Sequence, residues 1–162
     1  MKKQSRQIEL LINSLNEVYR IEQVIESLPR GYISVKKIAG HVYYYRQWRE
    51  KDKIISNYVP ETFLNGVKQK IVIRKENEQL LKIVKKDLAK AIKNVLKEGS
   101  LNESQIELLK QGAEYDNLKP SEKEEFALKQ FENCSDEVKK DIPYYVDGTI
   151  SYNNLLLKSW EE

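Results

Sequence analysis

Residues 31–59 read GYISVKKIAGHVYYYRQWREKDKIISNYV, and this stretch decides the fold of the chain. It is rich in Tyr, Val and Ile, which favour β-strands, and it lies between two long segments with helical periodicity. Ala39-Gly40 fits a two-residue hairpin turn, because glycine readily adopts the positive φ that such turns need. With a second turn over residues 50–53, the stretch predicts a three-stranded antiparallel meander.

The two turns also predict which side chains share a face of the meander. The first turn sets Ile38 opposite His41, and the second sets Tyr45 opposite Tyr58. Successive side chains of a strand point to opposite faces. One face, here called the packing face, is expected to pack on helices, with Arg46 and Asn57 as polar exceptions. Its apolar members are Ile33, Val35, Val42, Tyr44, Trp48, Ile55 and Val59.

The opposite face, here called the tyrosine face, carries the candidate binding residues. Lysine and arginine could contact phosphates there, tyrosines could stack or hydrogen-bond, and Gln47 could read a base edge, as in β-sheets that bind nucleic acid. Tyrosine is also simply a good strand former, and protein interfaces are enriched in the same residues. Both alternatives therefore stay open. The face comprises Tyr32, Ser34, Lys36, Tyr43, Tyr45, Gln47, Arg49, Ser56 and Tyr58.

Helices are predicted on both sides of the meander, which makes the fold class α+β. The first helix is long and stops at Pro29, because the residue before a proline is pushed out of the α region. The second runs over residues 61–98, is rich in lysine and stops at Gly99. Lys82 and Lys86 on this basic helix are further candidates for phosphate contacts, although such a lysine row is usually just a solvated face.

Charge divides the chain into two predicted domains, residues 1–98 and residues 99–162. The first holds 21 Lys and Arg against 11 Asp and Glu, a net charge of +10, and the second holds 7 against 14, a net charge of −7. A basic half suits phosphates or an acidic partner, and an acidic half can recruit a basic partner or remain solvated. We expect an acidic, all-helical C-terminal region after the meander domain.

Short helices are predicted within this C-terminal region. Two capping-box patterns, Ser100 with Glu103 and Ser121 with Glu124, are typical of helix starts. Ser135 is expected to cap a third helix that Pro143 interrupts or ends, and SYNNLLLKSW at residues 151–160 is expected to form the last helix. Because the apolar residues are few, the region should either dock on the long helix or be a mobile acidic module.

Residues for catalysis are sparse. His41 is the only histidine and Cys134 the only cysteine, so neither a two-histidine metal site nor a histidine-based triad can be assembled. The sequence also lacks a glycine-rich phosphate loop. We therefore expect a non-enzymatic protein that uses no metal and no cofactor.

The N-terminal residues do not predict export or membrane insertion. MKKQSRQIELLINSLNE reaches Asn13, Asn16 and Glu17 before any apolar stretch of a signal peptide develops. No run of apolar residues reaches the length of a membrane span. We expect a cytoplasmic protein without a membrane partner.

Residues 28–59 carry a family resemblance. LPRGYISVKKIAGHVYYYRQWRE at residues 28–50, followed by IISNYV, is similar to the pattern LPxGYIxxKxIxGxxYYYxQxRE of a small domain family of prokaryotic proteins without assigned function. In that family, a helix precedes the meander and a lysine-rich helix follows it. The resemblance covers about residues 1–95. It implies the same architecture and no catalytic residue.

The C-terminal end resembles a second group of proteins. DGTISYNNLLLKSW at residues 147–160 distantly resembles the ending of small antitoxins of Fic-type toxin pairs. Their inhibitory motif is Ser/Thr-x-x-x-Glu-Gly, whereas here Ser121 and Glu125 are followed by Phe126. This departure puts an inhibitory glutamate in doubt.

Three functional hypotheses follow. The first is a nucleic-acid-binding or regulatory protein that uses the tyrosine face. The second is a protein-binding inhibitor of the antitoxin, anti-nuclease or anti-CRISPR kind, from a mobile element or phage. The third is a coiled-coil structural oligomer, such as a homodimer.

Overall fold

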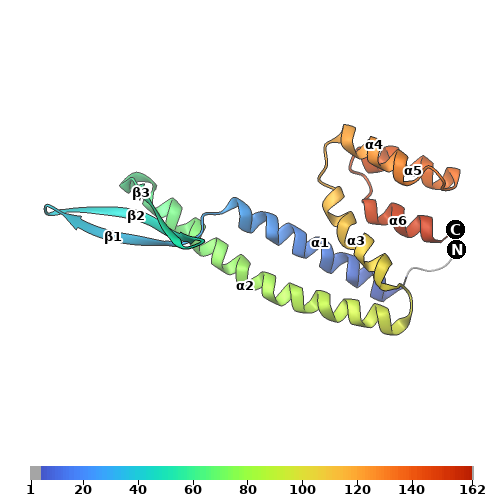
Figure 1. The fold of residues 1–162 in the computed structure, drawn as a ribbon, viewed down its shortest axis with the longest axis horizontal. Coiled ribbons are helices and arrows are strands. Elements are labelled where there is room, and N and C mark those ends of the chain that lie inside the picture. The colour runs from blue at the N-terminus through green and yellow to red at the C-terminus, as the bar shows by residue number, and fades with distance from the viewer. Residues whose placement is uncertain (1–4, 162) are drawn as a thin grey trace. The chain divides into compact units, whose positions relative to one another are not determined.

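The computed structural model describes residues 5–161 and confirms the predicted α+β fold (Figure 1). One helix precedes a three-stranded antiparallel meander, and five helices follow it. The elements are α1 (Arg6–Ser27), β1 (Tyr32–Ile38), β2 (His41–Glu50), β3 (Lys53–Val59), α2 (Glu61–Glu98), α3 (Glu103–Tyr115), α4 (Pro120–Gln130), α5 (Asp136–Val146) and α6 (Tyr152–Trp160).

The chain forms two compact units, each with its own packing. The meander unit comprises residues 20–83, and the helical unit comprises the described residues 5–19 and 84–161. Helices α1 and α2 therefore contribute residues to both units. The domain boundary expected at residue 98 stays a prediction, since it follows the charge distribution rather than the packing.

The register of the meander is the one predicted from its turns. Ile38 pairs with His41 across the first turn, and Tyr45 of β2 pairs with Tyr58 of β3. Ala39 and Gly40 both have positive φ, 52° and 81°, as a two-residue hairpin turn with the twist of the sheet requires. Because both turns are tight, the pairing and hence the face of every side chain is defined.

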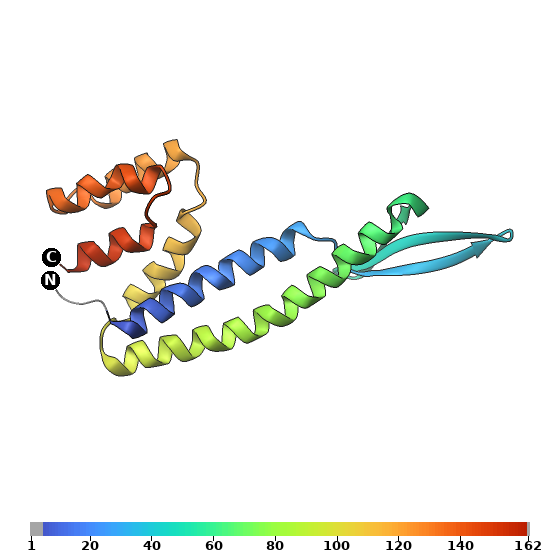
Figure 2. The same cartoon turned by 180° about the vertical axis from the view of Figure 1, so that it is seen from behind.

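The packing face is covered over only part of its length, so the expectation that it packs on helices holds for one part of it and not for the other. Val59 is 6% exposed, whereas Val35 is 60% and Val42 43% exposed. The last pair between β2 and β3 is Tyr44 with Val59, so the β1–β2 hairpin continues beyond it as a two-stranded tip. Figure 2 shows this tip extending past the first turn of α2.

An arginine of α2 hydrogen-bonds backbone carbonyl groups at the end of α1. Arg74 donates hydrogen bonds from Nη1 to the carbonyl oxygens of Ile25 (2.7 Å) and Leu28 (2.6 Å), and from Nε to Glu78 (3.0 Å). The last carbonyl groups of a helix lack partners within the helix, and a cation there also complements the helix dipole. Leu64, Val67 and Ile71 begin an apolar stripe on α2 that Arg74 interrupts and that resumes at Leu81, and the contacts of Arg74 explain this interruption. Helix α2 is one unbroken helix across that position.

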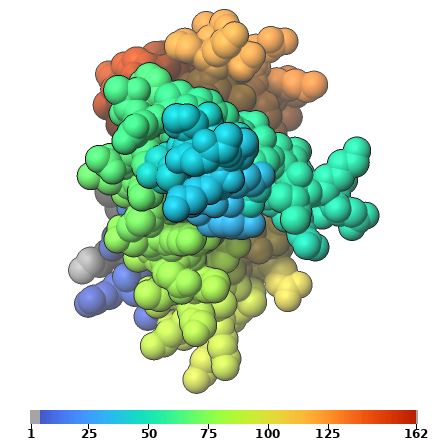
Figure 3. All heavy atoms as spheres, turned by 90° about the vertical axis from the view of Figure 1, so that its left-hand side faces the viewer, coloured from blue at the N-terminus to red at the C-terminus, as the bar shows by residue number. Residues whose placement is uncertain are grey.

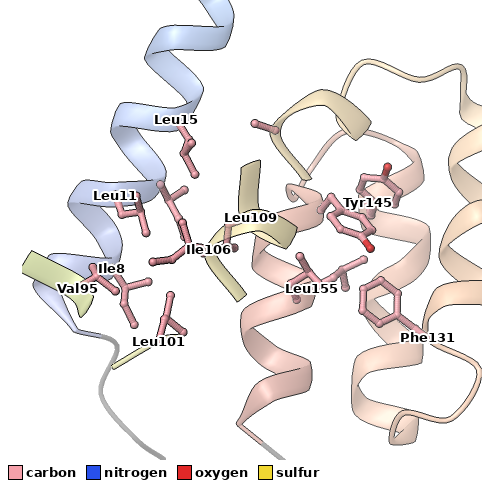
Figure 4. Close-up of a cluster of buried hydrophobic side chains, with 14 of the residues drawn as sticks. Ile8, Leu11, Leu15, Val95, Leu101, Ile106, Leu109, Phe131, Tyr145 and Leu155 are labelled. Carbon is pink, nitrogen blue, oxygen red and sulfur yellow. The ribbon is translucent and has the colours of Figure 1, made fainter. Parts of the chain in front are cut away.

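The helical unit has a single apolar core built by both ends of the chain. Figure 4 shows Leu11 and Leu15 of α1 facing Ile106 and Leu109 of α3, with Val95 of α2 beside them. The core continues through α4, α5 and α6, and Leu109, Val138, Tyr145 and Leu155 are fully buried in it. The C-terminal helices therefore dock on α1 and α2, as one of the two predicted alternatives has it.

The predicted caps of α3 and α4 are each wrong by two residues. Asn102 caps α3 in a reciprocal pair with Gln105, and both hydrogen bonds measure 2.9 Å. Helix α4 begins at Pro120, and its N-cap is Lys119 rather than Ser121. Ser135 and Ser151 precede α5 and α6 as expected.

Pro143 lies inside α5 instead of ending it. The helix runs on to Val146, and the N–H of Asp147 donates to the Pro143 carbonyl (3.0 Å), so the helical bonding resumes after the proline. Burial of Ile142 and Tyr145 in the core holds this part of the helix in place against the lost hydrogen bond.

Helix α2 also exposes an apolar row within the meander unit. Val72, Ile73, Leu80 and Ile83 recur at helical spacing and are 41–58% exposed. The row is short and interrupted by charged residues. Across residues 5–161, no helix has both the length and the apolar content needed to cross a membrane.

A close approach between α3 and α6 yields a test of the helical unit. A Cβ added at Gly112 would overlap Asn153 Oδ1 and lie 2.8 Å from Tyr152 Cδ1. Asn153 is fully buried and donates to the Leu109 carbonyl (3.0 Å), so it has little freedom to move. We predict that Gly112→Ala lowers the free energy of unfolding by about 1–3 kcal/mol, as overpacking does.

Gly66 provides the matched control, because it is also helical but a Cβ there meets nothing within 4 Å. Gly66→Ala should raise the stability by about 0.5–1 kcal/mol. Urea unfolding followed by circular dichroism measures both variants. Equal stability of the two would contradict the close packing of α3 against α6.

Candidate nucleic-acid interface

The meander brings seven predicted binding residues onto one face. Tyr32 pairs with Gln47 and Lys36 pairs with Tyr43 between β1 and β2, while Tyr45 pairs with Tyr58 between β2 and β3. Arg49 lies on the same face, two residues beyond Gln47. Alternation along the strands makes these side chains neighbours.

The tyrosine face carries no carboxylate. In residues 32–59, the acidic residues are Glu50 and Asp52. Glu50 pairs with Lys53 on the packing face, and Asp52 lies in the second turn. A surface with cations and without carboxylates has a positive electrostatic potential, which attracts a polyanion.

A hydrogen-bonded row crosses all three strands at one end of the face. The Tyr32 hydroxyl donates to Gln47 Oε1 (2.9 Å), and Gln47 Nε2 donates to Ser56 Oγ (3.3 Å). The Gln47 amide thus retains one N–H and one oxygen lone pair for a ligand. The row fixes the orientation of Gln47, so a ligand would meet a preorganised amide.

Beside this row lies a cluster of three tyrosines and one lysine. The ring of Tyr58 lies 5.8 Å from that of Tyr45 in an edge-on contact and 6.3 Å from that of Tyr43 in a tilted one. The Lys36 ammonium lies 4.7 Å from the centre of the Tyr45 ring, a cation–π contact. The cluster holds a positive charge directly over the aromatic surface.

Two rings of the face remain open to solvent. Tyr32 is 52% and Tyr58 56% exposed, and Lys36 and Arg49 are exposed as well. In the space-filling view of Figure 3, the end of the β1–β2 hairpin faces the viewer uncovered. The face can therefore offer stacking surfaces and cations together, which is the combination that proteins binding single-stranded nucleic acid use.

Of the two predicted lysines of α2, Lys82 alone belongs to the meander unit. Lys82 is exposed and lies eight residues beyond Arg74, about 12 Å further along the helix. Lys86 is exposed and belongs to the helical unit. The interface is accordingly described by its seven meander residues.

A second basic cluster, which the sequence analysis did not predict, lies on the packing face. Arg46 donates from Nη1 to the Arg30 carbonyl (2.7 Å), and its guanidinium stacks on the Trp48 ring at 3.8 Å. Burial, and then the charges of Arg30 and Arg74, lower the pKa of Arg46. The sequence contains two signals for this cluster: Arg46 interrupts the apolar pattern of β2, and Arg74 interrupts that of α2.

Groups for metal binding do not converge in the part of the chain that the structure describes. Among residues 5–161, no three His, Cys, Asp or Glu side chains are placed to hold one ion. His41, the single histidine, lies at the hairpin tip and is exposed.

Comparison with known proteins adds one similarity. Residues 1–69 match the model of a family described as a domain of unknown function (DUF6788). The match includes α1, the whole meander and the start of α2, and supports the predicted resemblance to a small domain family without assigned function. The residue pattern itself and a prokaryotic origin stay predictions. No curated protein and no solved structure matches the chain.

Arg74 provides a test of how this part of the meander unit is held together. Arg74→Met removes the hydrogen bonds to the Ile25 and Leu28 carbonyls, and its side chain is only 18% exposed. We predict a loss of about 1–3 kcal/mol in the free energy of unfolding, the usual cost of unpaired buried polar groups. Lys75→Met, at the exposed neighbouring position, should change it by less than about 0.5 kcal/mol. Denaturant titration of both variants checks this, and equal midpoints would argue against the cap.

Proposed function

We propose that the protein binds nucleic acid through the tyrosine face and is not an enzyme. The observation that supports this most directly is the composition of that face: four tyrosines, Lys36 and Arg49 share it with no carboxylate. Phosphate contacts by the two cations would supply affinity, because they displace counterions from the polyanion. Gln47 and the tyrosine hydroxyls would contribute hydrogen bonds.

Single strands fit the face better than duplexes. A base can stack on an exposed tyrosine ring only when it is not enclosed in a double helix. Tyr32 and Tyr58 are both more than half exposed and lie in the two outer strands, on either side of β2. A single strand crossing the meander would meet both rings.

Self-association is a second candidate function. The row of Val72, Ile73, Leu80 and Ile83 on α2 favours it, because exposed apolar residues at helical spacing are typical of helix pairing. The molar mass in solution decides this candidate. The inhibitor hypothesis stays a prediction, since no contact of the described residues favours it over the other two.

Fluorescence anisotropy with labelled single-stranded and duplex oligonucleotides at two salt concentrations tests the nucleic-acid proposal. We expect binding that weakens steeply with salt and that favours single strands. Tyr58→Ala should weaken it by about 1–3 kcal/mol, the usual contribution of one stacked base. Lys36→Ala should reduce the slope of log affinity against log salt by about 0.7 for a single strand.

Matched controls come from the neighbouring positions on the packing face. Lys37→Ala and Asn57→Ala each follow or precede a mutated residue by one position, but their side chains point to the other face. Both should bind nearly as the unchanged protein does. Absence of binding at low salt would overturn the proposal. Equal losses of affinity for Lys36→Ala and Lys37→Ala would show that binding does not use the tyrosine face.

A further inference from the structure

A basic pocket lies on the packing face at the end of the meander opposite the hairpin tip. Its volume is about 360 Å³. It is formed by one residue of α1, by the segment that joins α1 to β1, by two residues of β2 and by one residue of α2, all within the meander unit. We call it the arginine pocket. Its lining residues are Glu26, Leu28, Pro29, Arg30, Arg46, Trp48 and Arg74.

The guanidinium groups of the arginine pocket are held in place mainly by backbone carbonyl groups. Arg46 is bonded to the Arg30 carbonyl and stacked on Trp48, and Arg74 is bonded to two carbonyl groups at the end of α1. Arg30 forms an exposed ion pair with Glu50 (3.2 Å). These contacts fix the groups but consume only part of their donors, because each guanidinium has five N–H groups.

Positive charge exceeds negative charge in this pocket. Three guanidinium groups line it against the single carboxylate of Glu26. Arg30 and Arg74 each have a carboxylate partner, Glu50 and Glu78, whereas Arg46 forms no ion pair with any residue from 5 to 161. Burial lowers the pKa of Arg46, and the positive charges of Arg30 and Arg74 lower it further. A bound anion would relieve that repulsion.

We propose that the arginine pocket binds a phosphate group. A guanidinium offers two parallel N–H donors that match two oxygens of a phosphate, and it is the preferred side chain for such contacts. The phosphate could belong to a nucleic-acid backbone or to a free phosphate compound. Since Arg46 and Trp48 point away from the tyrosine face, the site does not depend on the function proposed above.

Trp48 supplies a reporter for this site. The chain has two tryptophans, and Trp160→Phe leaves Trp48 as the only one. Because the Trp48 ring touches the Arg46 guanidinium, an anion that moves Arg46 should change the Trp48 fluorescence. The Trp160→Phe protein is titrated with inorganic phosphate and, separately, with a single-stranded oligonucleotide, each at an ionic strength held constant with sodium chloride.

We expect a saturable fluorescence change with inorganic phosphate that sodium chloride alone does not produce. Arg46→Gln in the same background should weaken binding by about tenfold or more, the effect of losing one charge-assisted contact. Arg30→Gln should weaken it too, and because the Arg30 side chain is 45% exposed, this substitution should cost little stability. Lys75→Gln is the matched control, because Lys75 is exposed beside Arg74 on α2 and does not line the pocket, and it should bind phosphate unchanged.

The outcomes separate cleanly. Saturation by inorganic phosphate points to a free phosphate compound, and much tighter saturation by the oligonucleotide points to a backbone phosphate; both support the site. A response to neither ligand, an equal response to chloride, or equal affinities for Arg30→Gln and Lys75→Gln would overturn it. If Tyr58→Ala abolishes oligonucleotide binding but still binds inorganic phosphate, the arginine pocket and the tyrosine face are separate sites.

Discussion

The pairing register of the meander is the constraint on which the candidate sites depend. Two tight turns fix it, one at Ala39-Gly40 and one at Lys51-Asp52, and Lys51 also has a positive φ of 53°. A slip of one residue would exchange the faces of every side chain in the slipped strand. The separation of Tyr45 and Gln47 from Arg46 and Trp48 on β2 follows directly from this register.

Where α1 ends beside the meander, arginine side chains connect the elements by hydrogen bonds to backbone carbonyl groups. Here the chain must turn from a helix into a strand, and carbonyl groups of residues 25–30 accept hydrogen bonds from side chains of other elements. Arg74 and Arg46 bond three of these carbonyls from α2 and β2. Both guanidinium groups also line the arginine pocket, and Arg46 brings a positive charge without a carboxylate partner among residues 5–161. The contacts that hold the end of α1 in place therefore also form the candidate phosphate site.

The meander could be predicted from the sequence because its determinants are local. Ala39-Gly40 and the alternation on both sides of it define the register within about 30 residues, and the structure confirms that register. The roles of Arg46 and Arg74 could not be predicted in this way. Arg74 bonds carbonyls 46 and 49 residues away in the chain, and only the tertiary fold brings them together.

The helix starts of the C-terminal region show a different limit of sequence reasoning. Ser100 and Asn102 are both good capping residues, and a capping-box pattern exists for each, with Glu103 and with Gln105. Propensity alone does not rank the two. In the structure Asn102 is the cap, and its Oδ1 accepts from the Gln105 N–H (2.9 Å), whereas the Ser100 hydroxyl donates to Glu98 at the end of α2 (2.5 Å). At Pro143, burial of the flanking residues outweighs the proline's tendency to end a helix.

The most direct test of binding through the tyrosine face is nuclear magnetic resonance of the isoleucine methyl groups during titration with a single-stranded oligonucleotide. Ile38 and Ile54 lie on that face, whereas Ile33 and Ile55 lie on the packing face, so the protein carries probes on both sides of one sheet. Binding through the tyrosine face predicts shifts of the Ile38 and Ile54 methyl signals that saturate with the ligand. Unchanged Ile38 and Ile54 signals at saturating oligonucleotide would contradict it.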